Sequence, residues 1–157
     1  MILLALGANL PGWDGRLPVA TCRAAVEALR SLPGLEVAAV SSWHTTPPWP
    51  PSGQPDYCNG AVRLHGTADP AWLLARLQAI ESAAGRQRSV PNAARTLDLD
   101  IIAIGSLVRD APDPILPHPR AHLRRFVLAP LAEVAPGWVH PRLGRTTAEL
   151  LAALPPG

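Results

Sequence analysis

Two acidic residues two positions apart, Asp98 and Asp100, are the sharpest candidates for chemistry in this 157-residue chain. They lie in the otherwise apolar run 97–104, whose composition is typical of a β-strand. A strand turns residues i and i+2 to the same face, so both carboxylates would point to one place. Such carboxylates repel each other unless they share a cation, and their hard oxygen atoms suit Mg²⁺ with substrate phosphates as further ligands. The alternative is an exposed face of an edge strand.

Arginine residues flank this acidic pair on both sides. They are Arg86, Arg88 and Arg95 before it and Arg120, Arg124 and Arg125 after it. All 14 basic residues of the chain are Arg, which excludes a Walker-type phosphate loop and Schiff-base chemistry, because both need Lys. Acids that hold a metal, together with guanidinium groups that neutralise phosphate oxygens, are what a magnesium-bound polyphosphate requires.

His118 has a proline on each side, Pro117 and Pro119, which fixes its backbone in an irregular loop close to the same arginines. A histidine placed there could donate a hydrogen bond to a phosphate, although a lone histidine in a loop more often has a structural or solvated role.

Aromatic residues near these elements indicate a site for a flat ring. The chain has one Tyr, Tyr57, just after a proline-rich loop, and one Phe, Phe126, just after Arg125. Heteroaromatic ligands are commonly held between such rings, while an amide such as that of Asn59 binds the ring edge. Both aromatic residues could equally belong to the core.

The elements that must position these residues follow from hydrophobic periodicity and turn chemistry. Strands are predicted at 2–6, 35–43, 57–65 and 97–104, and helices at about 16–29 and 70–84. Asp69 is expected to cap the second helix and Pro70 to open it. This β-α-β-β-α-β order predicts an α+β fold, the ferredoxin-like antiparallel sheet with helices packed on one face.

The connecting segments are expected to be turns and loops. Gly7 and Asn9 would begin a turn after the first strand, the proline-rich segment 45–55 would be a shaped loop, and 86–94 would be a polar loop. Beyond Gly105 the chain adds a proline-rich connection, a segment at 123–134 and a short helix near 146–154. The absence of a repeat or linker predicts a single domain, 1–157.

Composition favours a compact globular protein, because 48% of the residues are hydrophobic and 17% are charged. The apolar runs are too short for a membrane span, and the first residues do not have the pattern of a signal peptide, so a cytoplasmic location is expected. Cys22 and Cys58 have neither metal-like nor redox-like spacing and are expected to be reduced, buried thiols.

Several sequence blocks occur together in a characteristic order. They are Leu6-Gly7-Ala8-Asn9-Leu10, Thr46-Pro47-Pro48, Gln54-Pro55-Asp56-Tyr57-Cys58-Asn59, Ile80-Glu81, Gly85-Arg86, Arg95-Thr96-Leu97-Asp98-Leu99-Asp100, Pro117-His118-Pro119-Arg120 and Arg124-Arg125-Phe126-Val127-Leu128. Over nearly its whole length the chain resembles the 6-hydroxymethyl-7,8-dihydropterin pyrophosphokinases. The resemblance implies the ferredoxin-like core, mobile loops, and transfer of pyrophosphate from ATP to the pterin hydroxymethyl group in folate synthesis, with release of AMP.

The same resemblance implies a role for each matching residue. Asp98 and Asp100 would ligate two Mg²⁺ ions that bridge the ATP phosphates, and Arg86 and Arg95 would be catalytic with them. The residues implied to bind ATP are Gln78, Arg86, Arg88, Arg95, His118 and Arg124, with Glu81 on the same side of the pocket. Tyr57 and Phe126 would hold the pterin between them, with Asn59, Thr46 and Pro48 at its edge. The implied partners are these small molecules, without nucleic acid or membrane, and a monomer is expected.

The chain departs from the family pattern at three places. The stretch 89–94 lacks the Trp that well-known members carry in a mobile loop, Pro119 replaces a Tyr, and Asp113 stands where some members have an Arg. Those roles are therefore not assigned here. Two other functions stay open: a magnesium-dependent phosphohydrolase or nuclease that uses the same acids, and a non-catalytic RNA-binding module with an arginine-rich face. The second lacks the paired aromatic residues that such modules use to stack bases.

Overall fold

A computed structural model describes residues 1–9, 17–47, 56–85 and 96–155 of the chain. The elements in these ranges are β1 (Ile2–Ala8), α1 (Pro18–Leu29), β2 (Leu35–Val40), β3 (His44–Thr46), β4 (Tyr57–Gly66), α2 (Pro70–Ala83), β5 (Asp98–Ile104), the 3-10 turn η1 (Ala121–Leu123), α3 (Arg125–Val134) and α4 (Thr147–Ala152). Among the helices of these ranges, none has the length and apolar character that crossing a membrane requires.

The strands form one antiparallel sheet in the order β2-β4-β1-β5, and β3 pairs with the first residues of β4 on the same side as β2. The two strands at the centre, β1 and β4, are not consecutive in sequence. Between them the chain passes through α1 and then through the strands β2 and β3, which pair with the other side of β4. This order confirms the predicted α+β, ferredoxin-like core.

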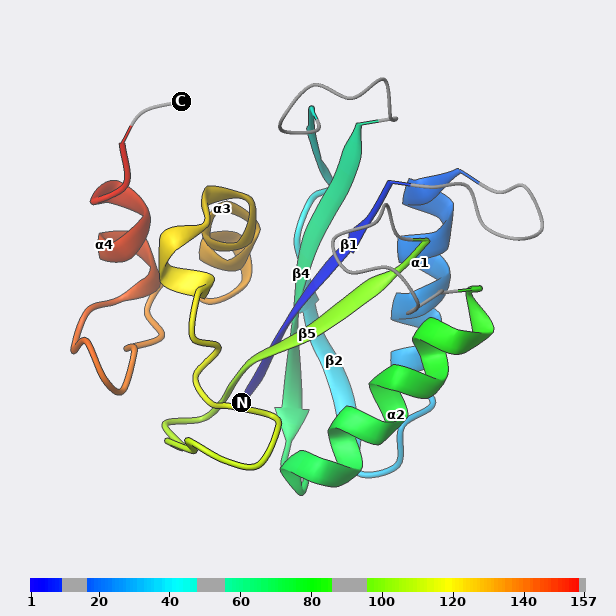
Figure 1. The fold of residues 1–157 in the computed structure, drawn as a ribbon, viewed down its shortest axis with the longest axis horizontal. Helices are drawn as coiled ribbons and strands as arrows, with labels where there is room; N and C mark the ends of the chain where they lie inside the picture. Colours follow the sequence, from blue (N-terminus) through cyan, green and yellow to red (C-terminus); the bar gives the residue numbers. More distant parts are fainter. Residues whose placement is uncertain (10–16, 48–55, 86–95, 156–157) are drawn as a thin grey trace.

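Helices cover both faces of the sheet, with α1 and α2 on one side and α3 and α4 on the other (Figure 1). The sequence predicted helices on one face and left the C-terminal additions unplaced. The strand β1 shows why the second layer is needed: Leu3 and Leu4 point to opposite faces, and both are fully buried. The first belongs to the core under α3 and the second to the core under α1 and α2.

Two predicted strand boundaries were wrong. The first strand continues through Gly7 and Ala8, which pair with β4, although Gly7 was expected in a turn. The predicted strand 35–43 ends at Val40, and Thr45 and Thr46 lie in β3 rather than in a loop. At the break, the Ser41 backbone N–H donates to Ala61 O and the Ser41 hydroxyl accepts from Ala61 N, so this edge stays bonded to β4.

The start of α2 follows the predicted capping chemistry, and α4 begins with a cap that was not predicted. The Asp69 carboxylate accepts a hydrogen bond from Trp72 N at 3.0 Å, and Pro70 opens α2. Thr146 and Glu149 form a reciprocal capping box at the start of α4. Helix α1 begins at Pro18, while the predicted start at Arg16 lies outside the described residues. Cys22 and Cys58 are free and buried, as expected.

Candidate active site

The candidate site lies on the sheet face that α3 covers, at the end where β1 finishes and β4 and β5 begin. Residues directly opposite each other in an antiparallel pair point to the same face. Gly7 lies opposite Asn59 on one side and opposite Asp98 on the other, and Ala5 lies opposite Asp100. Because Ala5 packs in the core under α3, both carboxylates and the Asn59 amide face that helix layer.

The acidic pair is held by a buried carboxylate on the other side of the sheet. Glu81 of α2 is only 2% exposed, and its Oε2 accepts a hydrogen bond from Leu99 N at 2.8 Å. Leu99 stands between Asp98 and Asp100 and points into the core under α2. Glu81 therefore fixes, from behind, the backbone of the strand that carries Asp98 and Asp100.

Asp98 and Asp100 fit a magnesium ion by the chemistry of their donors. They supply carboxylate oxygens from one strand face, and both are partly buried. Among the described residues, no group of three or more His, Cys, Asp or Glu side chains is arranged to hold a metal. Mg²⁺ is usually coordinated by one or two carboxylates together with phosphate oxygens and water, and seldom by protein ligands alone. Two carboxylates are therefore enough protein ligands for such a site.

His118 lies within electrostatic reach of Asp98 and of two arginines. Its backbone N–H donates to Ile102 O at 2.8 Å, which ties the loop to β5. Burial, followed by the positive charges of Arg124 and Arg120, lowers the pKa of His118, while Asp98 acts in the opposite direction. The ring is therefore neutral at neutral pH, and because Nδ1 accepts from Arg120 N at 3.1 Å, its proton is on Nε2. That N–H can donate to a phosphate oxygen.

Asn59 is fixed where the pterin edge was predicted. It is 6% exposed, and its Nδ2 donates to the Thr46 hydroxyl at 3.1 Å. A Cβ added to Gly7 would lie 3.0 Å from Asn59 Oδ1, so glycine at this strand position leaves room for the amide. Tyr57 lies opposite Thr46 and on the same face.

Arg124 and Phe126 stand at the beginning of α3. The Arg124 guanidinium lies 5.6 Å from the centroid of the Phe126 ring. Phe126 is 44% exposed, which is unusual for a large apolar ring and leaves a surface for stacking. The start of α3 thus presents a cation beside an aromatic ring.

One predicted site residue, Gln78, is not brought to this face, and four others cannot be placed on it or off it because they are not among the described residues. Gln78 is exposed on α2, which packs on the opposite side of the sheet, so its ATP-binding role stays a prediction. Pro48, Arg86, Arg88 and Arg95 lie outside the described residues.

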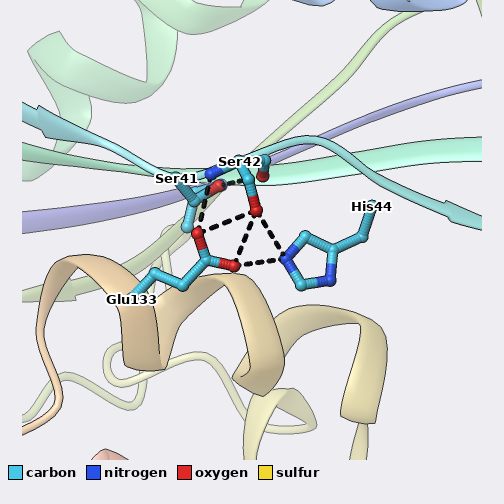
Figure 2. A network of polar contacts seen from close by, with 5 residues as sticks. Ser41, Ser42, His44 and Glu133 are labelled. Carbon is cyan, nitrogen blue, oxygen red and sulfur yellow. Dashed lines mark hydrogen bonds and ion pairs between the residues drawn. The ribbon is translucent and has the colours of Figure 1, made fainter.

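The structure also shows polar residues that the sequence analysis missed. Ser42, His44 and Glu133 form a hydrogen-bonded network between the β3 edge and α3 (Figure 2). Glu133 is 91 positions from Ser42, so no local pattern could have paired them. Gly7 had a detectable signal, because an isolated glycine within a strand often marks a close approach.

Comparison with known proteins gives consistent results. The model of the family described as 7,8-dihydro-6-hydroxymethylpterin-pyrophosphokinase matches residues 3–136. A Synechocystis sp. protein named 2-amino-4-hydroxy-6-hydroxymethyldihydropteridine pyrophosphokinase is 43% identical over 127 residues, which cover 81% of this chain and 65% of that protein.

A Pseudomonas aeruginosa protein of the same name is 40% identical over 98% of this chain and 91% of its own length. The Pneumocystis carinii protein named folic acid synthesis protein fol1 is 33% identical over 75% of this chain and 16% of its own length. The chain belongs to the 7,8-dihydro-6-hydroxymethylpterin-pyrophosphokinase family.

Proposed function

We propose that this chain transfers pyrophosphate from ATP to the hydroxymethyl group of 6-hydroxymethyl-7,8-dihydropterin, releasing AMP, as a step of folate synthesis. The observation that carries the proposal is that a carboxylate pair and a fixed amide share one sheet face. Asp98 and Asp100 lie across β1 from Asn59, which is bonded to Thr46, and the family of the chain supplies the reaction.

Each proposed site residue has a role that suits its chemistry. Asp98 and Asp100 would hold two Mg²⁺ ions with the ATP phosphates, and a bound metal would neutralise charge that develops on phosphate oxygens. Arg124 and the Nε2–H of His118 would bind those oxygens, as would Arg86, Arg88 and Arg95. Tyr57 and Phe126 would stack on the pterin, while Asn59, Thr46 and Pro48 bind its edge.

The reaction needs no side-chain nucleophile. The pterin hydroxymethyl oxygen attacks the β-phosphorus of ATP, the bond from that phosphorus to the AMP oxygen breaks, and the hydroxyl proton passes to solvent. The protein contributes positioning and charge stabilisation. A neutral His118 suits this role, because it offers a hydrogen bond without needing a proton from solution.

Product analysis tests the proposal. The protein is incubated with ATP and Mg²⁺, with and without the reduced pterin, and nucleotides are separated by chromatography. AMP that forms only with pterin supports transfer, whereas ADP or hydrolysis independent of pterin would establish the phosphohydrolase alternative instead.

Size-exclusion chromatography tests the accompanying proposal of a monomer. Fluorescence microscopy of the tagged chain tests the proposed cytoplasmic location.

The alternative of an RNA-binding module is disfavoured by the second helix layer. Modules of this fold stack bases on an open sheet face. Here Leu3, Ala61 and Ile102 of that face are buried under α3 and α4 (Figure 1).

A further inference from the structure

A polar clamp joins the sheet edge to α3 close to the candidate pterin site. Glu133 Oε1 accepts from Ser42 N at 2.7 Å, and both of its carboxylate oxygens lie 2.9 Å from the Ser42 hydroxyl (Figure 2). His44 Nε2 contacts Glu133 Oε2 and lies 3.3 Å from the Ser42 hydroxyl. We call these three residues the Ser42–His44–Glu133 clamp.

The carboxylate is ionised under these bonds. The hydrogen bond from the Ser42 backbone lowers the pKa of Glu133, and those from the His44 and Ser42 side chains act in the same direction against partial burial. The clamp therefore contains charge-assisted hydrogen bonds, which are stronger and more directional than neutral ones.

Its two sides lead directly to proposed pterin residues. On β3, His44 and Thr46 share one face, because they are two positions apart in a strand, and Thr46 accepts from Asn59. On α3, Phe126 and Glu133 share one stripe, because they are about two helical turns apart. Since α3 begins beside His118 and β3 ends at Thr46, both elements extend from the clamp toward the site.

A different set of contacts holds the start of α3. Arg124 N donates to Ala121 O at 3.2 Å, and the loop before η1 is bonded to β5 through His118 N. At the other end Arg63 Nε donates to Val134 O at 2.8 Å, which ties α3 to β4. The clamp adds a link between α3 and β3, the short edge strand that carries Thr46.

We propose that the Ser42–His44–Glu133 clamp is a positioning device for the pterin: it fixes the α3 stripe that carries Phe126 against the β3 face that carries Thr46. This inference rests on the proposed function. Because Phe126 and Thr46 lie on different elements, the spacing between the ring and the Asn59–Thr46 pair depends on how α3 and β3 are held together. Loosening that link would change the spacing available to the pterin.

The clamp is not itself a catalytic triad. In such a triad the two ring nitrogens have different partners, with the carboxylate on one and the hydroxyl on the other. Here the hydroxyl and the carboxylate converge on the same atom, His44 Nε2, and the hydroxyl also contacts the carboxylate directly. The arrangement holds elements together and does not relay a proton.

Steady-state kinetics on the full chain separate positioning from general structure. Initial rates of AMP formation are measured with pterin varied at saturating MgATP, and with MgATP varied at saturating pterin. In Ser42→Ala and Glu133→Ala we expect KM for pterin to rise about five- to tenfold, with KM for ATP within about twofold of the parent chain. In the double variant the increase should match that of Glu133→Ala alone, because the Ser42 hydroxyl has lost its carboxylate partner once Glu133 is removed.

Substitutions at His44 give the conservative control. The amide nitrogen of Gln can stand where His Nε2 stands and donate to Glu133, whereas Ala cannot. His44→Gln should therefore keep KM for pterin within about twofold, and His44→Ala should raise it about threefold or more. Glu27→Ala removes an exposed carboxylate that pairs with Arg30 on α1, behind the sheet, and should change neither KM.

Other kinetic outcomes would contradict the proposed positioning role. Equal increases of both KM values, or a fall in kcat alone, would show that the clamp serves general structure, and unchanged kinetics in Glu133→Ala would remove it from the site. Unfolding by urea identifies any variant that fails to fold, and Glu133→Gln, which keeps an acceptor for Ser42 N, then replaces Glu133→Ala with the same expected direction. Pterin-dependent AMP formation by the parent chain tests the proposed function separately.

Discussion

Asp98 and Asp100 differ from the other acidic residues of the chain in what surrounds them. Asp110, for comparison, is exposed and paired with Arg142 in the C-terminal part. Asp98 instead lies across β1 from Asn59, and its charge acts on His118. A carboxylate that shares one sheet face with an amide and has a neutral hydrogen-bond donor within electrostatic range has a chemical setting that an isolated surface acid lacks.

Removing either acid should abolish most activity without unfolding the chain. For Asp98→Asn and Asp100→Asn we expect kcat to fall by about 10²-fold or more, because each carboxylate is proposed to supply a metal ligand on which charge neutralisation in the transition state depends. The rate of pterin-dependent AMP formation measures this, and Asp110→Asn is the matched control. Near-normal turnover in either site variant would mean that the metal ligands lie elsewhere.

His118 should make stability depend on pH. Its pKa in the folded chain is below the ordinary value of 6.5, so the unfolded state binds more protons at acid pH. The free energy of unfolding should therefore fall as pH decreases through about 6.5, with the loss complete below the folded pKa. Urea unfolding between about pH 7.5 and about pH 5 measures the slope, and His118→Gln should reduce it.

Some slope should remain in that variant, because burial also lowers the pKa of His140. The same slope in His118→Gln and in the parent chain would contradict the assignment of a depressed His118 pKa.

At the scale of elements, the edge formed by β2 and β3 depends on close packing at one glycine. A Cβ added to Gly60 would lie 2.4 Å from Trp43 Cζ3 and 2.5 Å from its Cε3. The indole ring packs on the core under α1 and α2. It lies close in sequence to Ser41, which connects β2 to β3 and whose hydroxyl accepts a hydrogen bond from Ala61 N of β4. Glycine in the middle of β4 thus allows the edge to bend and continue into β3.

Gly60→Ala should accordingly destabilise the fold by about 1–3 kcal/mol, the usual cost of forcing an overpacked side chain to move. Chemical unfolding measures the change. Gly137→Ala is the matched control, because nothing lies within 4 Å of its added Cβ, and it should stay within about 0.5 kcal/mol of the parent chain. A Gly60→Ala protein as stable as the control would show that Trp43 can shift freely.

At the scale of the whole molecule, the two helix layers have different duties. The layer of α1 and α2 supports the sheet and fixes β5 through Glu81. The layer of α3 and α4 closes the second face, and it also carries Arg124 and Phe126 to the site. Equally destabilising substitutions in the two cores should therefore change KM for pterin to different extents.

Leu131 of α3 and Leu29 of α1 provide that comparison, since both are fully buried in opposite cores. Each change to Ala should cost about 2–5 kcal/mol of unfolding free energy, from lost burial and a residual cavity. At a temperature where both proteins stay folded, Leu131→Ala should raise KM for pterin, and Leu29→Ala should leave it close to the parent value. Equal KM changes would mean that α3 does not set the pterin site.

The sequence by itself determined the local parts of this protein. The period-2 and helical patterns gave the core strands and helices, and Asp69 marks a cap that depends only on neighbouring residues. The spacing of Asp98 and Asp100 placed both carboxylates on one face. These features depend on residues a few positions apart, where geometry is fixed by the backbone. The family blocks added the reaction, because they retain the chemistry of the site in order along the chain.

Only the tertiary structure decided which distant residues meet. That Asn59 occupies the space above Gly7, that Glu81 holds β5 from behind, and that Glu133 bonds Ser42 across 91 positions all depend on strand register and on α3 covering the second sheet face. Such contacts leave no local pattern in the sequence, because the two residues of each pair are far apart along the chain and neither identifies the other. The acids and arginines of the site are therefore visible in the sequence, whereas the clamp beside them is visible only in the fold.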